Sequence, residues 1–370
     1  MGLPEITINF HKKAQNLIRR SSRGIVCIIL QDDTKEQPVT PIRGYTDIVE
    51  ADWSDKSRQY LKLVFRGYPG GVIAVRAVEA AETTEEGETG EAEKKADINA
   101  TLELIRFLNF DYLCMPGFRM SYQENIKTFL EKIRKEGKKG KAVLPNFAAD
   151  SSAVINVTTS GISMKWDDEE EIRELGTAEF CCRIAGICAG IPLTQSTTFF
   201  VLEEVLDAEQ VEDPDARIDA GELVIVYDGE KHKVGRGVTS LQEATELEPA
   251  DFKKIKVREG ADIIKNDIYT TFHDDYVGKL NNTYDNKQAF IGAVNSYFAS
   301  LAGTVLDGNE ENYVDIDVEK ARQYLKDSGR DVDEMTEQQI REANTGSRLF
   351  LCGKICLLDA MEDLDMTLEM

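Results

Sequence analysis

The chain has 370 residues, of which 42% are hydrophobic and 30% are charged, as in ordinary globular proteins. Its formal net charge of −23 argues against nucleic acid or an anionic membrane as a partner, because both attract basic surfaces. The opening residues lack the apolar core of a secretory signal, and the most apolar stretch, residues 180–193, is too short to span a bilayer. We therefore expect a soluble protein, made in a cytoplasm, that does not insert into membranes.

The chain begins with a short alternation of apolar and polar residues. Ile6, Ile8 and Phe10 recur with a period of two, which predicts a half-buried strand. A short terminal strand is not stable alone and needs a sheet to join. Residues 11–23, which follow, are polar and basic. The strand therefore either reaches away from the body or packs on its own domain.

The first half of the chain alternates between apolar runs and helical patterns. Buried strands are predicted at residues 24–30, 72–77, 110–115 and 142–144, and helices at 55–66, 98–109 and 121–136. Ser121 and Glu124 have the spacing of a capping box at the start of the last helix. The acidic tract at 79–95 is expected to be an exposed loop. This alternation predicts a mixed α/β (α+β) body with parallel strand pairing.

The second half contains a helix of small residues at 177–190, in which Gly186 and Gly190 would let another backbone approach closely. Apolar positions repeat with helical spacing around 264–276 and 290–301. Further strands are predicted at 197–202, 221–227, 232–234, 348–351, 355–358 and 364–368. In the last of these, apolar residues alternate with acidic or hydroxyl residues. Both ends of the chain are thus predicted to be strands.

No group of residues predicts catalysis, a metal site or a cofactor. His11, His232 and His273 lie in polar surroundings, where we expect them to be exposed, without a second ligand at metal-binding spacing. The seven cysteines lie mostly in apolar runs and are expected to be buried and inert. The sequence contains no Walker A loop, no complete dinucleotide-binding motif and no GxSxG motif. We predict that the protein is not an enzyme and needs no cofactor.

A basic cluster consists of Lys132, Arg134, Lys135, Lys138, Lys139 and Lys141. These cations could be solvated and complement the carboxyl end of a helix. They could also form an ion-pair patch for an acidic segment of a neighbouring copy, such as residues 167–171. The sequence leaves both interpretations open.

Seven stretches, spread in order over nearly the whole chain, share one resemblance. They include GLPEITINF at the start and FDYLCMPG in the middle, and they cover residues 2–10, 20–30, 110–117, 183–202, 218–241, 278–308 and 342–370. Together they resemble the tail sheath proteins of contractile-tailed phages and phage-tail-like bacteriocins. The chain is most similar to the compact sheath proteins of phages and defective prophages of Gram-positive bacteria. Residues 31–69 and 79–95 match poorly.

The resemblance implies a structural subunit that polymerises as stacked hexameric rings around a tail tube. Contraction of the polymer would drive the tube through the target cell envelope. Its partners would be further copies of itself, the tail tube protein, and the baseplate and tail terminator proteins, without nucleic acid. It would be located in the tail of a virion or phage-tail-like particle, assembled in the bacterial host cytoplasm.

In the resembled family, terminal arms add strands to a small sheet in neighbouring subunits. Applied to this chain, the N-terminal arm would pack through Ile6, Ile8 and Phe10, and the C-terminal arm through Leu364, Met366 and Leu368. The accepting strands would contain Leu349, Leu351, Ile355 and Leu357. The resemblance also implies a helix that holds the tube, for which we expect residues 261–280, with Lys265 and Lys279 as contacts.

The predicted organisation is an N-terminal arm at 1–20, an α/β domain at 21–200, a C-terminal sheath domain at 201–358 and a C-terminal arm at 359–370. An α/β enzyme is the main alternative, because alternating strands and helices suit that class, although no phosphate loop or catalytic triad supports it. A scaffold protein that assembles into another lattice is the second alternative.

Overall fold

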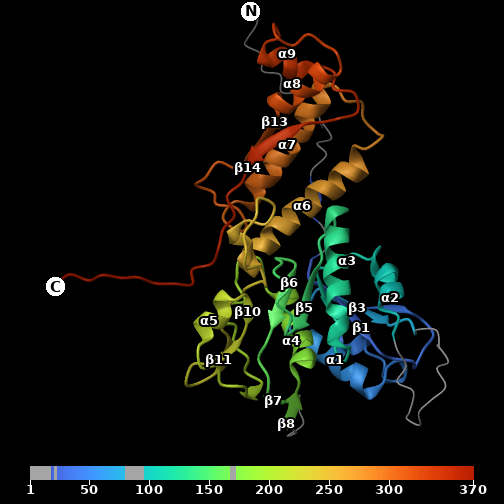
Figure 1. Ribbon diagram of the computed structural model, residues 1–370, viewed down its shortest axis with the longest axis vertical. Coiled ribbons are helices and arrows are strands. Elements are labelled where there is room, and N and C mark those ends of the chain that lie inside the picture. Colours follow the sequence, from blue (N-terminus) through green and yellow to red (C-terminus); the bar gives the residue numbers. More distant parts are fainter. Residues whose placement is uncertain (1–17, 21–22, 80–95, 167–171) are drawn as a thin grey trace, which may run out of the picture. The chain divides into compact units, whose positions relative to one another are not determined.

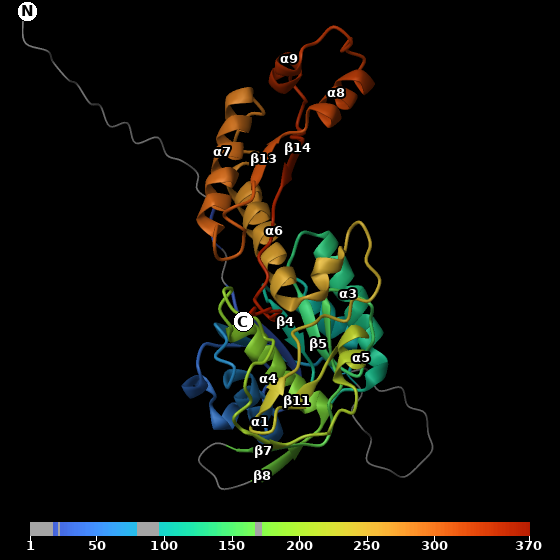
Figure 2. The ribbon, with the colours of Figure 1, turned by 90° about the vertical axis from the view of Figure 1, so that its left-hand side faces the viewer.

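The structure is a computed structural model, and it describes residues 18–20, 23–79, 96–166 and 172–370. The chain divides into two compact units (Figures 1 and 2). Unit 1 comprises residues 1–20 and 267–358, and unit 2 comprises residues 21–266 and 359–370. The predicted N-terminal strand with Ile6, Ile8 and Phe10, and His11, lie outside the described residues.

Unit 2 is built on a sheet that has seven strands among the described residues, in the order β10-β6-β5-β4-β1-β3-β2. All pairs are parallel except β2 with β3. The strands are β1 (Ile25–Leu30), β2 (Val39–Ile42), β3 (Gly71–Arg76), β4 (Tyr112–Cys114), β5 (Lys141–Pro145), β6 (Val154–Val157) and β10 (Glu222–Leu223). The predicted parallel α/β body is confirmed.

Helices cover both faces of this sheet (Figure 1). Val26, Ile28 and Leu30 of β1 pack into a core with α1 (Asp55–Phe65) and α4 (Thr177–Gly190). Cys27 and Ile29 point into a second core, with α2 (Ile98–Ile105) and α3 (Gln123–Lys135). A strand buried on both faces must be apolar at every position, which explains why this run has no polar alternation.

The rest of unit 2 consists of short strands and turns. A sheet in the order β8-β7-β9 contains β7 (Ile162–Lys165), β8 (Ile172–Leu175) and β9 (Val205–Asp207). The strands β11 (Ile225–Tyr227) and β12 (His232–Val234) form a hairpin, whose turn is closed by a hydrogen bond from the Asp228 N–H to the Lys231 carbonyl at 3.2 Å. Helix α5 spans Pro214–Asp219, and 3-10 turns occur at Tyr45–Asp47, Glu50–Asp52, Met120–Tyr122 and Ala250–Lys253. The predicted strand at 197–202 is wrong, since it contributes only an isolated bridge from Val201 to Lys233.

Helices α1 and α4 approach each other closely through glycines. A Cβ atom at Gly186 would lie inside van der Waals contact of the Val64 carbonyl oxygen, and one at Gly190 would overlap the Gly67 carbonyl. The predicted role of the two glycines is therefore confirmed. Their absence of side chains lets α4 lie directly on the backbone of α1.

Unit 1 contains the carboxyl end of α6 (Ile255–Asp275), which begins in unit 2, followed by α7 (Tyr284–Leu301). Phe272 and Tyr276 pack against Phe290 of α7, with ring centroids 5.2 and 4.8 Å away. The unit also contains two short helices and an antiparallel pair of strands: α8 (Val318–Asp327), α9 (Glu337–Glu342), β13 (Tyr313–Ile316) and β14 (Leu351–Lys354).

Three local predictions differ from the structure. The capping box at Ser121 does not form, because a 3-10 turn at Met120–Tyr122 leads into α3 and the helix starts without a side-chain cap. The strand predicted at 348–351 is shifted to Leu351–Lys354, and residues 355–358 and 364–368 are not strands in the single chain. Residues 201–266 belong to unit 2 rather than to a separate C-terminal domain, because β10 pairs with β6 of the large sheet.

The glycine contact between α1 and α4 is testable by adding one methyl group. We expect Gly186→Ala to destabilise the protein by about 1–3 kcal/mol or more, since the added Cβ overlaps rigid backbone. Gly292→Ala in α7 is the matched control, because a Cβ there meets no atom within 4 Å. That control should be neutral or stabilising by up to about 1 kcal/mol. Urea unfolding measures both, and equal effects would contradict the close approach.

Candidate functional site

The pair of strands in unit 1 has an open edge. β13 and β14 are antiparallel and form a sheet that has two strands among the described residues. The outer edge of β13 is covered at Val314, whose N–H and C=O bond to the side chain of Asn295. Because residues opposite each other alternate in direction, Gly353, paired with Val314, and Leu351 turn their backbone groups away from β13. No described residue bonds to them, so β14 presents an edge that another strand can join.

The C-terminal arm has a root that is fixed on unit 2. The carboxylate of Glu362 is nearly inaccessible and accepts hydrogen bonds from Ser196 Oγ, Thr198 Oγ and Lys254 Nζ, at 2.9, 2.6 and 2.5 Å. Arg236 pairs with Asp363, and Lys254 also pairs with Asp359 at 2.8 Å. We call residues 359–363 with these partners the arm clamp. Burial opposes ionisation of Glu362, but the bonds from Lys254, Thr198 and Ser196 hold its pKa below the usual value.

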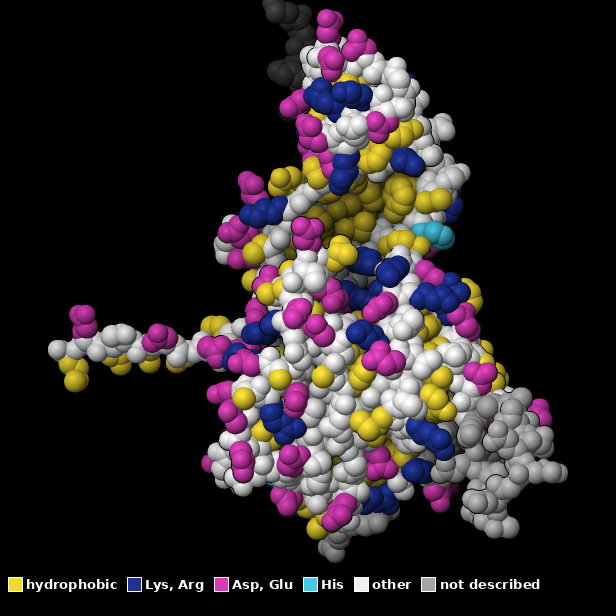
Figure 3. All heavy atoms as spheres, in the orientation of Figure 1, with side chains coloured by type: hydrophobic (Ala, Val, Ile, Leu, Met, Phe, Trp, Pro, Cys, Tyr) yellow, Lys and Arg dark blue, Asp and Glu magenta, His cyan; other side chains and the backbone are white. Residues whose placement is uncertain are grey.

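Residues 364–370, which we call the tip, are exposed in the single chain. Leu364, Met366 and Leu368 are 84%, 64% and 78% exposed. Figure 3 shows the apolar side chains of the tip along one side and the acidic ones along the other. This is the alternation of a strand that has no sheet. An apolar stripe that the chain itself leaves in water indicates a docking segment.

The N-terminal arm enters unit 1 along α6 and α7. Ile18 is buried, and the Arg19 N–H donates to Thr271 Oγ1 at 3.1 Å, while its guanidinium pairs with Asp275 at 3.0 Å. Arg20 donates to the Ser300 carbonyl at 3.4 Å. These contacts hold residues 18–20 against α6 and α7, and the apolar residues 6, 8 and 10 of the arm lie outside the described part.

The amino-terminal half of α6 is held in unit 2 by buried charges. Asp262 accepts hydrogen bonds from Arg134 at 2.6 Å, Lys141 at 3.0 Å and Arg258 at 2.8 Å. Glu259 pairs with Lys141 at 3.2 Å and accepts from the hydroxyl of Tyr112. Burial raises the cost of ionising Asp262, yet the charges of Arg134 and Lys141 keep its pKa below the usual value.

Three residues of the basic cluster pair with carboxylates inside unit 2. Lys139 pairs with Asp111 at 2.6 Å inside unit 2, and both side chains are almost inaccessible. Lys141 and Arg134 bind the carboxylates of α6. Lys139 and Lys141 are buried, so for these two residues both predictions, a solvated patch and a patch for a neighbouring copy, are wrong. Arg134 lies in the last turn of α3, as predicted, but its guanidinium binds Asp262. The sequence does not reveal these partners, because Asp111 lies directly before another strand, β4, and Asp262 lies more than a hundred residues from Arg134 and Lys141.

The two lysines expected to hold a tube have local partners. Lys265 donates to the Arg134 carbonyl at 2.9 Å, and Lys279 donates to the Asp274 carbonyl. Both therefore cap the carboxyl end of a helix, α3 and α6 respectively. A contact of these residues with a tube stays a prediction.

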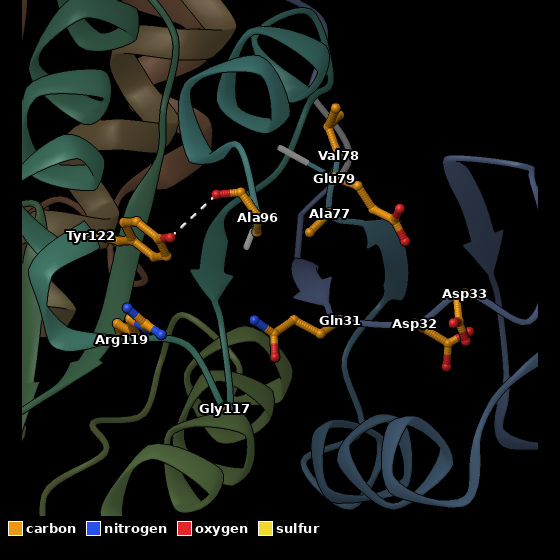
Figure 4. A pocket seen from close by; sticks show the side chains of 10 residues that line it. All are labelled: Gln31, Asp32, Asp33, Ala77, Val78, Glu79, Ala96, Gly117, Arg119 and Tyr122. Atoms are coloured by element: carbon orange, nitrogen blue, oxygen red, sulfur yellow. Dashed lines mark hydrogen bonds between the residues drawn. The ribbon is translucent and has the colours of Figure 1, made fainter. Parts of the chain in front are cut away.

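A cavity of about 340 Å³ lies outside the carboxyl ends of β1, β3 and β4 (Figure 4). In an α/β enzyme this position, where the strand order reverses, holds the ligand. The described residues that line it include Gln31, Asp32, Glu79, Arg119 and Tyr122, but no histidine, serine or cysteine. Burial opposes ionisation of Asp32, but hydrogen bonds from Ser57, Thr34 and Ser54 keep its pKa below the usual range. A general base requires a pKa near the working pH, so this carboxylate is unsuited to that role.

The remaining candidate groups are metal ligands, membrane-spanning helices, cysteines and histidines. No three potential metal ligands gather among the described residues, and no described helix combines the length and apolarity that a bilayer crossing requires. Five cysteines are buried, as predicted, but Cys352 on β14 is exposed. His232, predicted to be exposed, is buried, because its ring bonds to the Val205 carbonyl at 3.2 Å. His273 is exposed, as predicted.

Comparison with known proteins identifies the family. Residues 91–240 match the central domain of phage tail sheath proteins, and residues 248–370 match their C-terminal domain. The tail sheath protein of Clostridium phage phiCD119 is 37% identical over 100% of this chain and 99% of its own length. The chain belongs to the phage tail sheath family. It is thus a structural tail protein.

Solved structures show the same fold at low sequence identity. A sheath tail protein from Desulfitobacterium hafniense is 17% identical with a TM-score of 0.64, over 85% of this chain and 94% of that one. One from Listeria innocua is 15% identical with a TM-score of 0.64, over 94% and 98%. The helical sheath of the anti-feeding prophage in its contracted state is 13% identical with a TM-score of 0.64, over 100% and 99%.

The buried charges around Asp262 in α6 predict that a single substitution of this residue strongly lowers the stability of the protein. Asp262→Asn should destabilise the sheath protein by about 3–5 kcal/mol, because it leaves Arg134 and Lys141 without their buried counter-charge. Since the folded pKa is lowered, this contribution is present above the ordinary aspartate pKa of about 3.9 and is lost as pH falls through the folded value. Denaturant unfolding at pH 7 and at acid pH measures it.

The control for that measurement is Asp55→Asn, which removes an exposed partner of Arg58. An exposed pair contributes about 1 kcal/mol at most. An Asp262 variant as stable as the Asp55 variant would show that the buried charges do not hold α6.

The arm clamp predicts that one residue fixes the root of the C-terminal arm. Glu362→Ala removes the acceptor shared by Ser196, Thr198 and Lys254, so residues 359–363 should detach from unit 2. We expect thermolysin to cut before Met361 at least several-fold faster, as measured by mass spectrometry. Glu369→Ala in the exposed tip is the control and should leave the rate unchanged. Equal rates in both variants would rule out the clamp.

Proposed function

We propose that this chain is the subunit of a contractile tail sheath, which polymerises as stacked hexameric rings around a tail tube. The polymer contracts and drives the tube through the target cell envelope. Its further partners are the tail tube protein and the baseplate and tail terminator proteins. The subunit is assembled in the bacterial host cytoplasm and ends in the tail of a virion or phage-tail-like particle. Family membership supports the general role, and the open edge of β14 carries the proposal for how copies join.

In this proposal each copy lends its termini to its neighbours. Strands that contain Ile6, Ile8 and Phe10, or Leu364, Met366 and Leu368, pair with the β14 edge of another copy, near Leu349, Leu351, Ile355 and Leu357. The backbone groups of Leu351 and Gly353 supply the hydrogen bonds. Burying each apolar side chain contributes about 1.5–3 kcal/mol, so one arm of three residues holds two copies together firmly.

Such links survive a rearrangement of the bodies, because an arm is joined to its own body by a short extended segment. At the C-terminal side the arm clamp holds residues 359–363 on their own body, so only the tip can reach another copy. Lys265 on α6 and Lys279, four residues after its end, are the proposed contacts with the tube. The acidic surface of the chain supports dependence on specific contacts, since random contacts between copies are repulsive.

Purified protein should form long hollow cylinders in negative-stain electron microscopy. Deleting residues 1–10 should abolish the cylinders while the circular dichroism of the body is unchanged. Dispersed wild-type monomers that turn over a substrate would favour the enzyme alternative. Cylinders formed without residues 1–10 would defeat strand donation by the N-terminal arm.

A single substitution tests the accepting edge. Leu351→Pro removes an amide that faces away from β13 and leaves the bonds between β13 and β14 in place. We expect it to fold normally and to prevent polymerisation. Leu351→Thr keeps the amide and is the matched control, which should polymerise. Polymers of the proline variant would show that β14 is not the accepting strand.

A further inference from the structure

Unit 1 carries an apolar hollow between the end of α6, the first half of α7 and the segment before β14 (Figure 3). Its volume is about 520 Å³, and its apolar lining includes Phe272, Tyr276, Leu280, Phe290 and Leu349. An apolar cavity of about 150 Å³ is large enough for benzene. The hollow therefore has room for several aliphatic side chains.

The polar residues of the lining, among those described, are Asn281, Asn282, Asn286, Ser347 and Lys287, of which Lys287 is the one charged residue. Lys287 is 4% exposed, and its ammonium donates to the Ala343 carbonyl at 3.0 Å. No carboxylate of the described residues forms an ion pair with it, and burial alone lowers its pKa. A buried ammonium without a counter-charge is costly, whereas pairing it with an anion in the same low-dielectric place recovers much of that cost. The hollow thus suits a ligand that is apolar and carries a carboxylate.

The tip has this composition. Leu364, Met366 and Leu368 alternate with Asp365 and Glu369, and the chain ends in a further carboxylate. The N-terminal segment fits less well, because Glu5 is its one acid and Lys12 and Lys13 follow its apolar residues. Of the two arms, the C-terminal one therefore matches the hollow in both polarity and charge.

The hollow also lies where a strand on the β14 edge would continue. Leu349 lines it and stands two residues before the first residue of β14. An extended segment advances about 3.3 Å per residue, so the seven residues of the tip span about 23 Å. A tip that begins on β14 therefore reaches the hollow.

We propose that the hollow binds the tip of a second copy of this chain, with the apolar side chains of the tip inside it and a tip carboxylate paired with Lys287. The inference rests on the proposed exchange of arms and adds to it a pocket and an ion pair. Lys287 acts as the residue that selects the acidic C-terminal arm over the basic N-terminal one.

Direct binding is measured with an acetylated, fluorescent peptide of residues 363–370 and a chain that lacks residues 364–370. We expect saturable binding that Lys287→Met weakens at least tenfold and makes insensitive to salt. Lys320→Met, at an exposed lysine of the same unit, is the control and should bind as the parent does. A peptide in which Asp365 and Glu369 are replaced by Asn and Gln should also bind at least tenfold more weakly. Absence of binding, or binding unaffected by Lys287→Met, overturns the proposal.

A mixing experiment shows which copy supplies the tip. One chain lacks residues 364–370, and the other carries Leu280→Trp, which fills the hollow; both lack residues 1–10 so that the other arm cannot link them. We expect each to be monomeric alone and the mixture to form a 1:1 dimer in analytical ultracentrifugation. Leu247→Trp, at an exposed leucine of unit 2, is the control and should leave self-association intact. Absence of a dimer in the mixture overturns docking between copies.

The two proposals fail separately. If Leu351→Pro prevents polymerisation but Lys287→Met has no effect on peptide binding, strand donation stands and the hollow is not its pocket. If Leu351→Pro polymerises normally, strand donation to β14 fails, whatever the peptide shows.

Discussion

An open strand edge can accept a further strand, and a buried charge is costly without a counter-charge; among the residues that the structure describes, unit 1 has both features. The outer groups of Leu351 and Gly353 have no bonding partner, and the ammonium of Lys287 has no counter-charge. A pair of strands is barely stable on its own, and a buried lone charge is costly. Both features support the proposal that a segment of another chain completes unit 1.

Unit 2 meets the same constraint within one chain. The carboxylates of Glu259, Asp262 and Glu362 are buried, and each has a cationic partner from a distant part of the sequence. These contacts hold the start of α6 and the root of the C-terminal arm on a sheet that is covered on both faces. The paired buried charges of unit 2 and the open edge of β14 in unit 1 are consistent with the proposed exchange of arms.

The sequence predicted what depends on local pattern. The run at 24–30 indicated a strand buried on both faces, and the small residues of α4 indicated a close contact. Gly186 makes that contact with the backbone of α1, and Gly190 makes it with Gly67 in the turn after α1. Register was harder, because β14 is a four-residue strand with Gly353 at its centre and has no alternation to reveal it. The prediction of a capping box at Ser121 was wrong, because the spacing of Ser121 and Glu124 does not reveal that a 3-10 turn precedes the helix.

The candidate site was predicted in outline only. The alternation in the tip was readable, and its exposure agrees with an arm that has no sheet of its own. The arm clamp was missed, because Glu362 looks like any other acid in a chain that has 67 of them. Lys287 was missed as well, because its burial follows from the packing of α6 and α7 and not from its neighbours in sequence.

The acidity of the chain bears on how the tip finds its place. Copies with a net charge of −23 repel one another, and the tip is itself acidic, so it gains nothing electrostatically from most of a neighbour's surface. At the hollow the one charged lining residue among those described is the buried Lys287, and the rest of the lining consists of apolar and uncharged polar residues. The same acidic residues that penalise random contacts would thus favour this one, which gives a specific attachment without making the whole surface adhesive.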